Sequence, residues 1–379
     1  MRSIVLSGAY PISSDPWGRD LLRGARRVIG VVCKRTRRCS GPRLLIQIEA
    51  LAKRLRRDPV TFTAQGPDGP VRLTLGEREV AEVVYGRGDP AVYGLLPAAI
   101  GAALDHDYAP LKRLAATSRI FQAAVLGVPP SRVSWADIAA VTCHDYPKPF
   151  DLAASPATRQ ADHDRALAAI DPADFRPFSA GAWFQSGIWA APVCLGWPAD
   201  ATAGSPLSGT TMPDVPVLVQ SGDLDTNTPV EQGRQAAAQF AHPTFAVVAN
   251  AGHTPDQQPC GAAMAIDFLK HLRTNPHRCV HAGRPPAVIG RPARRAANLA
   301  PVKVRAPASV RRRVAVALAT VADARVAASI ARLPGRTRLR LRGRGVLRSR
   351  LTLRSVGATT WIAGTVGGRR VAARVWSPQ

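Results

Sequence analysis

The stretch VPVLVQSGDLDTNTPVEQGRQAAAQFAHPTFAVVANAGHTP, residues 215–255, contains two short apolar runs with a helix-like segment between them. The runs at 215–220 and 245–248 are apolar throughout, which is typical of strands buried on both faces of a parallel sheet. Residues 229–240 indicate a helix that Thr228 can cap. Strand, helix and strand predict one right-handed crossover, so both strands end at the same edge of the sheet, where open α/β folds bind ligands.

Asp225 and His253 each follow the carboxyl end of one of these two strands. A carboxylate that accepts a hydrogen bond from one imidazole nitrogen fixes the tautomer and leaves the other nitrogen free as a base. Taken alone, each residue is more often a surface acid or a loop histidine. Taken together at one sheet edge, they predict a catalytic acid, Asp225, and a catalytic base, His253, within hydrogen-bond reach of each other.

Three motifs, SGDLDTNTP, VVANAGHTP and the following PC, resemble the carboxyl-terminal half of secreted α/β-hydrolases similar to tripeptidyl aminopeptidases, the TAP-like C-terminal domain. In that family the last Asp of G-x-x-D is the triad acid and the His of GH is the base, which implies these roles for Asp225 and His253. MRSIVLSGAYPISSDPWGRD at the start resembles the strand that enters the lid, and PVCLGWP (192–198) resembles the return of the lid. The resemblance spans roughly residues 3–280.

The resemblance implies an α/β protein with a partial α/β-hydrolase fold, comprising the last three core strands. We expect these strands at 3–7, 216–221 and 244–249, as neighbours at one end of the sheet. A mostly helical lid is inserted after the first strand, and a small basic β module follows the core. The expected divisions are a core strand at 1–8, a lid or cap insertion at 9–208, the carboxyl-terminal core at 209–282, a Pro/Arg-rich linker at 283–301 and the basic β module at 302–379.

The serine nucleophile of that family lies in G-x-S-x-G, and this motif is absent from the sequence. Ser7, Ser186 and Ser221 lack the flanking glycine pattern, so each is predicted to be an ordinary strand-end or loop serine. The family's strand corresponding to 3–7 follows the nucleophile, so we expect the serine and the oxyanion hole to lie upstream of Met1. The chain as written is then amino-terminally truncated and inactive, through either a misassigned start or a decayed gene.

Six cysteines are present, and we favour the pairs that are closest in sequence. These pairs are Cys33–Cys39, Cys143–Cys194 and Cys260–Cys279. The alternative is reduced thiols in a cytosolic protein. Disulfides and the family resemblance favour an extracellular or cell-wall-associated location, although no signal peptide is recognisable. The sequence contains no apolar stretch of about twenty residues, so we expect no transmembrane segment. It also lacks a C-x-x-C motif or a His/Cys spacing typical of zinc sites. No cofactor or metal ion is implied.

The predicted lid is mostly helical, with one hairpin. Asp15 with Pro16 opens a first helix, and Ser40 opens a second whose buried face holds Leu44, Ile48, Leu51 and Leu55. Residues 60–75 alternate about a turn and predict a hairpin. Further helices are expected at roughly 76–84, 90–104, 108–126 and 161–170. An aromatic group either lines a substrate groove or packs the core of the lid; it comprises Trp183, Phe184, Trp189 and Trp197.

The carboxyl-terminal region carries most of the net charge of +25, with 21 Arg and Lys against a single acid, Asp323, in residues 285–379. Residues 256–275 predict the last core helix. Beyond the linker, 336–355 alternates between leucine and arginine, and 359–376 predicts a hairpin that turns at Gly367–Gly368. The result is a small sheet with one apolar and one cationic face. Because arginine far exceeds lysine, codon bias is an alternative source of the charge.

Two functions from different classes therefore remain. The first is a serine hydrolase that acts on peptides, by resemblance, or on esters, and to which this chain supplies the acid and the base. The second is a non-catalytic protein that binds polyanions or the cell wall through its basic module, by contacts that are largely non-specific.

Overall fold

The computed structural model divides into two compact units, Met1–Ala115 with Leu126–Ile289 and Ala116–Val125 with Gly290–Gln379. The structure describes residues 2–66, 69–126, 133–186, 193–204, 206, 209–290, 300–302, 305–312, 314–316, 338–344, 348–356, 359–366 and 369–376. Trp189 and the turn expected at Gly367–Gly368 lie outside these ranges. Each unit is considered by itself.

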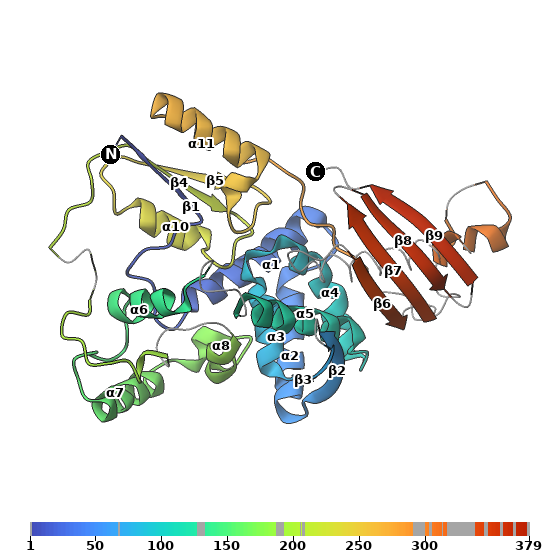
Figure 1. Ribbon diagram of the computed structural model, residues 1–379, viewed down its shortest axis with the longest axis horizontal. Helices are drawn as coiled ribbons and strands as arrows, with labels where there is room; N and C mark the ends of the chain where they lie inside the picture. The colour runs from blue at the N-terminus through green and yellow to red at the C-terminus, as the bar shows by residue number, and fades with distance from the viewer. Residues whose placement is uncertain are drawn as a thin grey trace. The chain divides into compact units, whose positions relative to one another are not determined.

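The first unit contains a parallel sheet of β1 (Ile4–Ser7), β4 (Val217–Gly222) and β5 (Pro243–Val248), in the order β1-β4-β5 (Figure 1). The three strands expected from the sequence are neighbours, as predicted. All residues of β4 are buried, because alternate positions face helices on opposite sides of the sheet. Val217 and Val219 pack with Ala237 of α10, whereas Leu218 packs with Met264 and Phe268 of α11. Helices on a parallel sheet place this unit in the α/β class.

The crossover helix α10 (Val230–Ala237) is shorter than predicted, and Pro229, not Thr228, is its N-cap residue. The expected cap was wrong: Thr228 lies one residue before the N-cap position, and its hydroxyl donates to Asp225.

The last helix was expected at 256–275 and is interrupted. A 3-10 turn, η3 (Pro255–Gln257), precedes α11 (Pro259–His271). Gln258 between them is extended, because the ring of a proline disfavours helical geometry in the residue before it.

The segment between β1 and β4, here called the helical insertion (residues 9–208), contains the predicted helices, although the first begins at Arg19 with Gly18 as its N-cap residue and is not opened by Asp15. Its helices are α1 (Arg19–Thr36), α2 (Gly41–Arg57), α3 (Glu77–Tyr85), η1 (Gly86–Gly88), α4 (Pro90–Leu104), α5 (Ala109–Leu126), α6 (Trp135–Asp145), α7 (Pro156–Ala168), η2 (Pro172–Phe175) and α8 (Ala180–Ser186). Among the described residues, α6, α8 and the 3-10 turns η1 and η2 were not predicted. The predicted hairpin is β2 (Val60–Gly66) paired antiparallel with β3 (Gly69–Leu75). The four leucine and isoleucine residues predicted for the inner face of α2 are all buried.

All three expected disulfides are present, at Cys33–Cys39, Cys143–Cys194 and Cys260–Cys279. The first joins the last turn of α1 to the segment after it, the second joins α6 to Cys194 near the end of the helical insertion, and the third joins α11 to the segment after it.

The aromatic residues of the helical insertion form part of its core. Trp183 is fully buried, stacks on Phe178 and donates its indole N–H to the Gly18 carbonyl at 3.3 Å. Phe184 packs edge-on against Phe175. Trp197 packs beside the Cys143–Cys194 disulfide. For these described residues, core packing accounts for the pattern better than a substrate groove.

The second unit contains a four-stranded antiparallel sheet in the order β6-β7-β8-β9. The strands are β6 (Arg338–Arg344), β7 (Arg348–Val356), β8 (Thr359–Val366) and β9 (Arg369–Trp376), as the alternating pattern predicted. The register pairs Leu341 with Leu351 and Arg342 with Arg350.

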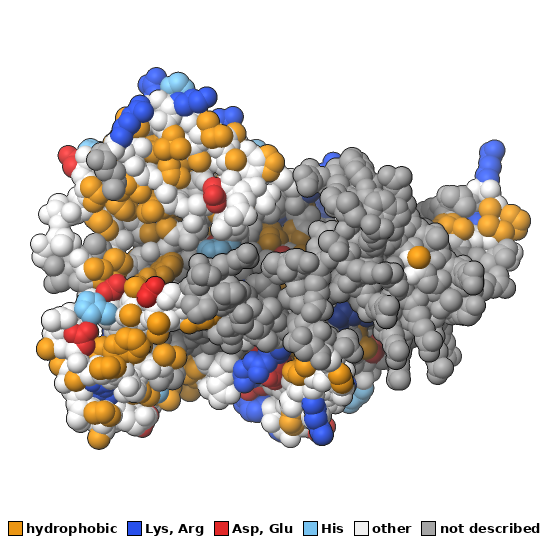
Figure 2. All heavy atoms as spheres, viewed as in Figure 1, with side chains coloured by type: hydrophobic (Ala, Val, Ile, Leu, Met, Phe, Trp, Pro, Cys, Tyr) orange, Lys and Arg blue, Asp and Glu red, His pale blue; other side chains and the backbone are white. Residues whose placement is uncertain are grey.

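Hydrophobic side chains are exposed over α11 and over parts of the helical insertion on the face in Figure 2. Ile266 and Leu269 of α11 and Ile138 and Val141 of α6 are among the large exposed hydrophobic residues. In the ranges that the structure describes, none of the helices has the length and apolarity needed to cross a membrane.

Candidate functional site

The Asp225 carboxylate lies in the turn after β4 and is fully buried. Its Oδ1 accepts hydrogen bonds from the backbone N–H groups of Asn227 at 2.7 Å and Thr228 at 3.1 Å. Its Oδ2 accepts from the Thr228 hydroxyl at 2.6 Å. A buried charge is tolerated where donors replace the lost water, so the DTNT turn is a preformed holder for a carboxylate.

His253 lies after β5 and faces this carboxylate, with its Nδ1 3.1 Å from Asp225 Oδ2. The predicted juxtaposition at the shared sheet edge is therefore present. The hydrogen bond to Asp225 raises the pKa of His253 above its usual value; burial opposes this, and the charges of Asp225 and Asp256 add to the rise. The ring is 35% exposed, so one side of it remains accessible. An acceptor-only carboxylate at Nδ1 places the proton on Nδ1 and leaves Nε2 as the base.

Backbone contacts with the helical insertion fix the position of the His253 loop. The His253 N–H donates to the carbonyl of Gly88 in η1 at 3.0 Å. Gly88 has φ of +75°, and a Cβ there would lie 2.7 Å from His253 Cβ and 2.9 Å from Asp225 Oδ1. Only glycine fits such a close approach. The sequence analysis did not identify Gly88; its one signal was the GRGDP turn between two predicted helices.

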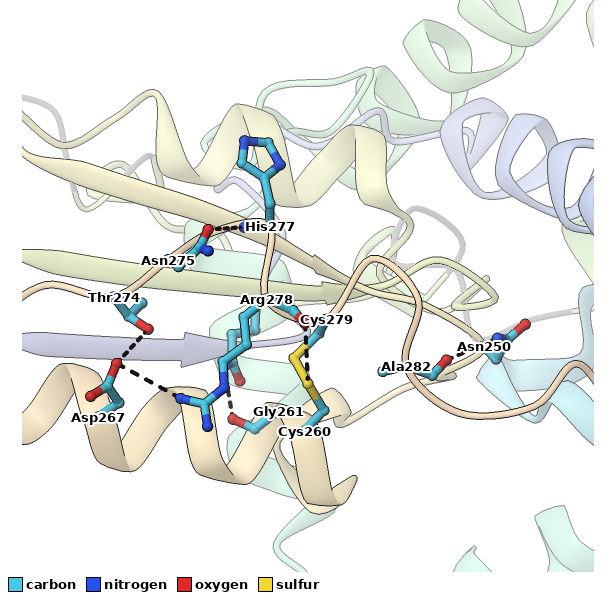
Figure 3. The surroundings of a disulfide bond; sticks show 11 residues. Asn250, Cys260, Gly261, Asp267, Thr274, Asn275, His277, Arg278, Cys279 and Ala282 are labelled. Carbon is cyan, nitrogen blue, oxygen red and sulfur yellow. Dashed lines mark hydrogen bonds and ion pairs between the residues drawn. A yellow bond between two sulfur atoms is a disulfide. The ribbon is translucent and has the colours of Figure 1, made fainter.

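A second anchor holds the start of this loop to the segment after α11. The Ala249 N–H donates to the Cys279 carbonyl at 3.0 Å, and the Asn250 amide donates to the Ala282 carbonyl at 2.9 Å. Figure 3 shows Asn250 beside Ala282, and Cys279 bonded to Cys260 at the beginning of α11. The disulfide thus ties α11 to the strand end that leads to His253.

The amide of Asn227 connects the imidazole to the helical insertion. Asn227 Nδ2 lies 3.3 Å from His253 Nε2, and its Oδ1 accepts a hydrogen bond from the Tyr85 hydroxyl at 2.6 Å. Tyr85 is the last residue of α3 and is buried. Neither residue was predicted from the sequence. Asn227 belongs to no motif that was recognised, and Tyr85 is far away in the chain.

In the described structure, no hydrogen bond joins His253 to Ser7, Ser186 or Ser221. The Ser7 hydroxyl donates to the Asp256 carboxylate, and the Ser186 hydroxyl donates to the Trp183 carbonyl at 2.7 Å. The buried Ser221 hydroxyl has no hydrogen-bond partner among the described residues. In the same residues, no three His, Cys, Asp or Glu side chains converge as a metal site requires.

Residues 181–279 match the family model described as TAP-like protein, which supports an α/β-hydrolase family for this chain. The matched segment includes both β4 and β5 and therefore contains Asp225 and His253. The comparisons found no matching curated protein and no matching solved structure.

Proposed function

We propose that Asp225 and His253 are the acid and base of a secreted serine hydrolase resembling the tripeptidyl aminopeptidases, with peptides as substrates. One observation carries the proposal, namely a fully buried carboxylate whose Oδ2, besides accepting from the Thr228 hydroxyl, meets His253 Nδ1 past adjacent parallel strands. The family match supports the hydrolase class. The three disulfides support an extracellular setting.

In this mechanism Nε2 of His253 accepts the proton of a serine hydroxyl as that hydroxyl attacks the carbonyl carbon of the substrate. Asp225 holds the Nδ1–H tautomer and stabilises the imidazolium that forms. His253 then returns the proton to the leaving amine. Because G-x-S-x-G is absent from the sequence, the proposal assigns the nucleophile and the oxyanion hole to polypeptide outside these 379 residues. The chain alone is then expected to hydrolyse neither peptides nor esters.

Titration of His253 by NMR tests the pair directly. Asp225→Asn removes the charged acceptor and is expected to lower the pKa of His253, because the first cause of its rise is the hydrogen bond to Asp225. Asp214→Asn is the matched control, since Asp214 is the exposed partner of His242 at 3.0 Å and does not contact His253. A His253 titration that is identical in the wild type and in Asp225→Asn would contradict the proposal.

A fluorophosphonate probe tests the assignment of the nucleophile. The 379-residue chain is expected to remain unlabelled, with a known serine hydrolase as the positive control. Stoichiometric labelling of Ser7, Ser186 or Ser221 would show that the chain contains its own nucleophile.

A second candidate, polyanion or cell-wall binding by the basic module, has one observation in its favour. The register of β6 and β7 pairs three arginine positions directly with three others, 338 with 354, 342 with 350 and 344 with 348. Like charges directly opposite each other destabilise an antiparallel pair, so a bound polyanion would relieve that repulsion. The same alternation places these positions on one face of the sheet.

Binding of the full chain to dextran sulfate at about 50 mM and 200 mM salt tests this candidate, since neutralised anionic groups give a steep salt dependence. Arg342→Gln with Arg350→Gln is expected to weaken binding and flatten that dependence. Arg37→Gln with Arg38→Gln, which removes the same charge from an exposed turn, is the control. Absence of binding at the lower salt concentration excludes the candidate.

A further inference from the structure

The Asn227 side chain lies between a buried phenol and the imidazole, and its orientation is determined by its two neighbours. The Tyr85 hydroxyl donates to Oδ1 at 2.6 Å, and the NH₂ group faces His253 Nε2 at 3.3 Å. An amide nitrogen donates and cannot accept. Nε2 of His253 must therefore be the acceptor, which is the unprotonated nitrogen of a neutral ring.

Both ends of the ring thus require the same tautomer. At the opposite end Nδ1 faces Asp225 Oδ2 at 3.1 Å, where a carboxylate can only accept. The two contacts are made by different parts of the chain, because Tyr85 belongs to α3 of the helical insertion. Asn227 consequently couples the tautomer of His253, and so its ability to act as a base, to the position of α3.

Tyr85 is well suited to orient the amide. It is only 6% exposed, and burial raises the pKa of its hydroxyl to about 12, so the phenol remains protonated and able to donate at neutral pH. The Trp183 ring packs edge-on against it with centroids 6.0 Å apart. The Thr226 hydroxyl also donates to the Tyr85 backbone carbonyl at 2.5 Å, so the residue next to Asn227 fixes the same end of α3.

We propose that Asn227, oriented by Tyr85, is a positioning residue that holds His253 in the neutral Nδ1–H tautomer and occupies Nε2 until a hydroxyl nucleophile displaces the amide. The displacement step rests on the proposed function. The tautomer and the coupling to α3 rest on the contacts alone and can be measured in this chain without turnover.

The test uses the full chain with isotope-labelled histidine and follows the ring nitrogens of His253 by NMR across pH. In the wild type, Nε2 is expected to be the unprotonated nitrogen at high pH. Asn227→Ala removes a hydrogen bond to the neutral form, so the pKa of His253 is expected to rise by about half a unit or more. Asn227→Asp replaces the donor by an anionic acceptor and is expected to raise it further.

Tyr85→Phe leaves Asn227 in place but frees its amide to rotate. The pKa of His253 is expected to rise less than in Asn227→Ala, with a loss of the single-tautomer signature. This variant also keeps the proposal testable if an Asn227 variant does not fold. The matched control is Asn275→Ala, since Asn275 is exposed and its side chain accepts from the His277 N–H, away from His253.

The outcomes separate the two proposals. If the Asn227 and Tyr85 variants leave the His253 tautomer and titration unchanged while Asp225→Asn lowers the pKa, Asn227 has only a structural role and the inference is wrong. If Asp225→Asn has no effect, the proposed acid–base pair is wrong. A shift in all three of Asn227→Ala, Tyr85→Phe and Asp225→Asn, with Asn275→Ala unchanged, supports both.

Discussion

The turn that holds Asp225 and the loop that holds His253 follow adjacent strands of one sheet but are stabilised in different ways. Among the residues that the structure describes, the donors to the carboxylate other than the imidazole come from Asn227 and Thr228, within three residues of Asp225. The His253 loop instead depends on distant groups, namely the Gly88 carbonyl of η1 and the segment near Cys279. The acid is therefore held by its own sequence, whereas the base is held by the fold.

This contrast gives different expectations for substitutions in the two places. Changes in the Asp225 turn should appear mainly as lost stability, because they leave buried donors without an acceptor. Changes around the His253 loop should also move the ring, because its anchors lie far away in the chain.

Asp225→Ala is expected to lower the free energy of unfolding by about 4 kcal/mol, since breaking a buried charged network from one side is strongly destabilising. Two backbone N–H groups and the Thr228 hydroxyl lose their acceptor. Urea denaturation measures the change. Asp214→Ala, which removes an exposed carboxylate, should alter stability by well under 1 kcal/mol. An equal effect of the two variants would show that the turn is not a preformed holder.

Replacing Cys260 and Cys279 by serine is expected to lower stability by about 3 kcal/mol, from the chain entropy of a loop of 19 residues. NMR shifts should change in the His253 loop, because Cys279 accepts from Ala249, and should not change in the Asp225 turn. The Cys33–Cys39 bond, with a separation of 6 residues, is the matched control. Its removal should cost less, and any change in the shifts of the His253 loop should be confined to Asn250, which accepts from Arg35 at 2.8 Å.

Thr228→Val removes one buried donor to Asp225 and is expected to lower the free energy of unfolding by about 1–2 kcal/mol. Thr202→Val provides the comparison, because Thr202 makes a similar 2.6 Å bond to the Asp200 carboxylate at an exposed position. Water replaces that bond when it is lost. Thermal or urea unfolding of the two variants should therefore differ clearly, and similar losses would argue against a special role for burial.

The smallest expected effect concerns pH. The folded-state pKa of His253 is raised above its unfolded value, so the stabilisation from its protonation is complete below the unfolded value, about 6.5. It is lost as pH rises through the folded-state pKa. Because the ring is 35% exposed, solvent screens the effect and the slope is shallow. Stability curves of the wild type and His253→Gln from about pH 6 to pH 9 should converge towards the alkaline end.

The contrast between the two loops also explains what the sequence could predict. The apolar runs located β4 and β5, the family resemblance implied that β1 is their neighbour, and strand ends at a common edge placed Asp225 near His253. Features that depend on the local sequence could thus be predicted. The break at Gln258 was also readable, because Pro259 follows it, but the continuous apolar pattern favoured one long helix.

What could not be predicted involves partners that are distant in sequence. No local pattern indicates that the carbonyl of Gly88 would accept from His253, or that Tyr85 would orient Asn227 across 142 positions. Thr228 illustrates a competition that propensity misses. Its side chain is a good helix cap in principle, yet Thr228 lies one residue before the N-cap Pro229 and donates to the buried Asp225 carboxylate.

The backbone bond between Gly88 and His253 has a practical consequence for protein engineering. The Gly88 carbonyl and the His253 N–H are joined by a hydrogen bond. The two segments therefore form one structural unit, although Gly88 belongs to the helical insertion. A chimaera that exchanges this insertion between relatives should therefore retain residues 85–90 with the recipient's histidine loop, including glycine at 88.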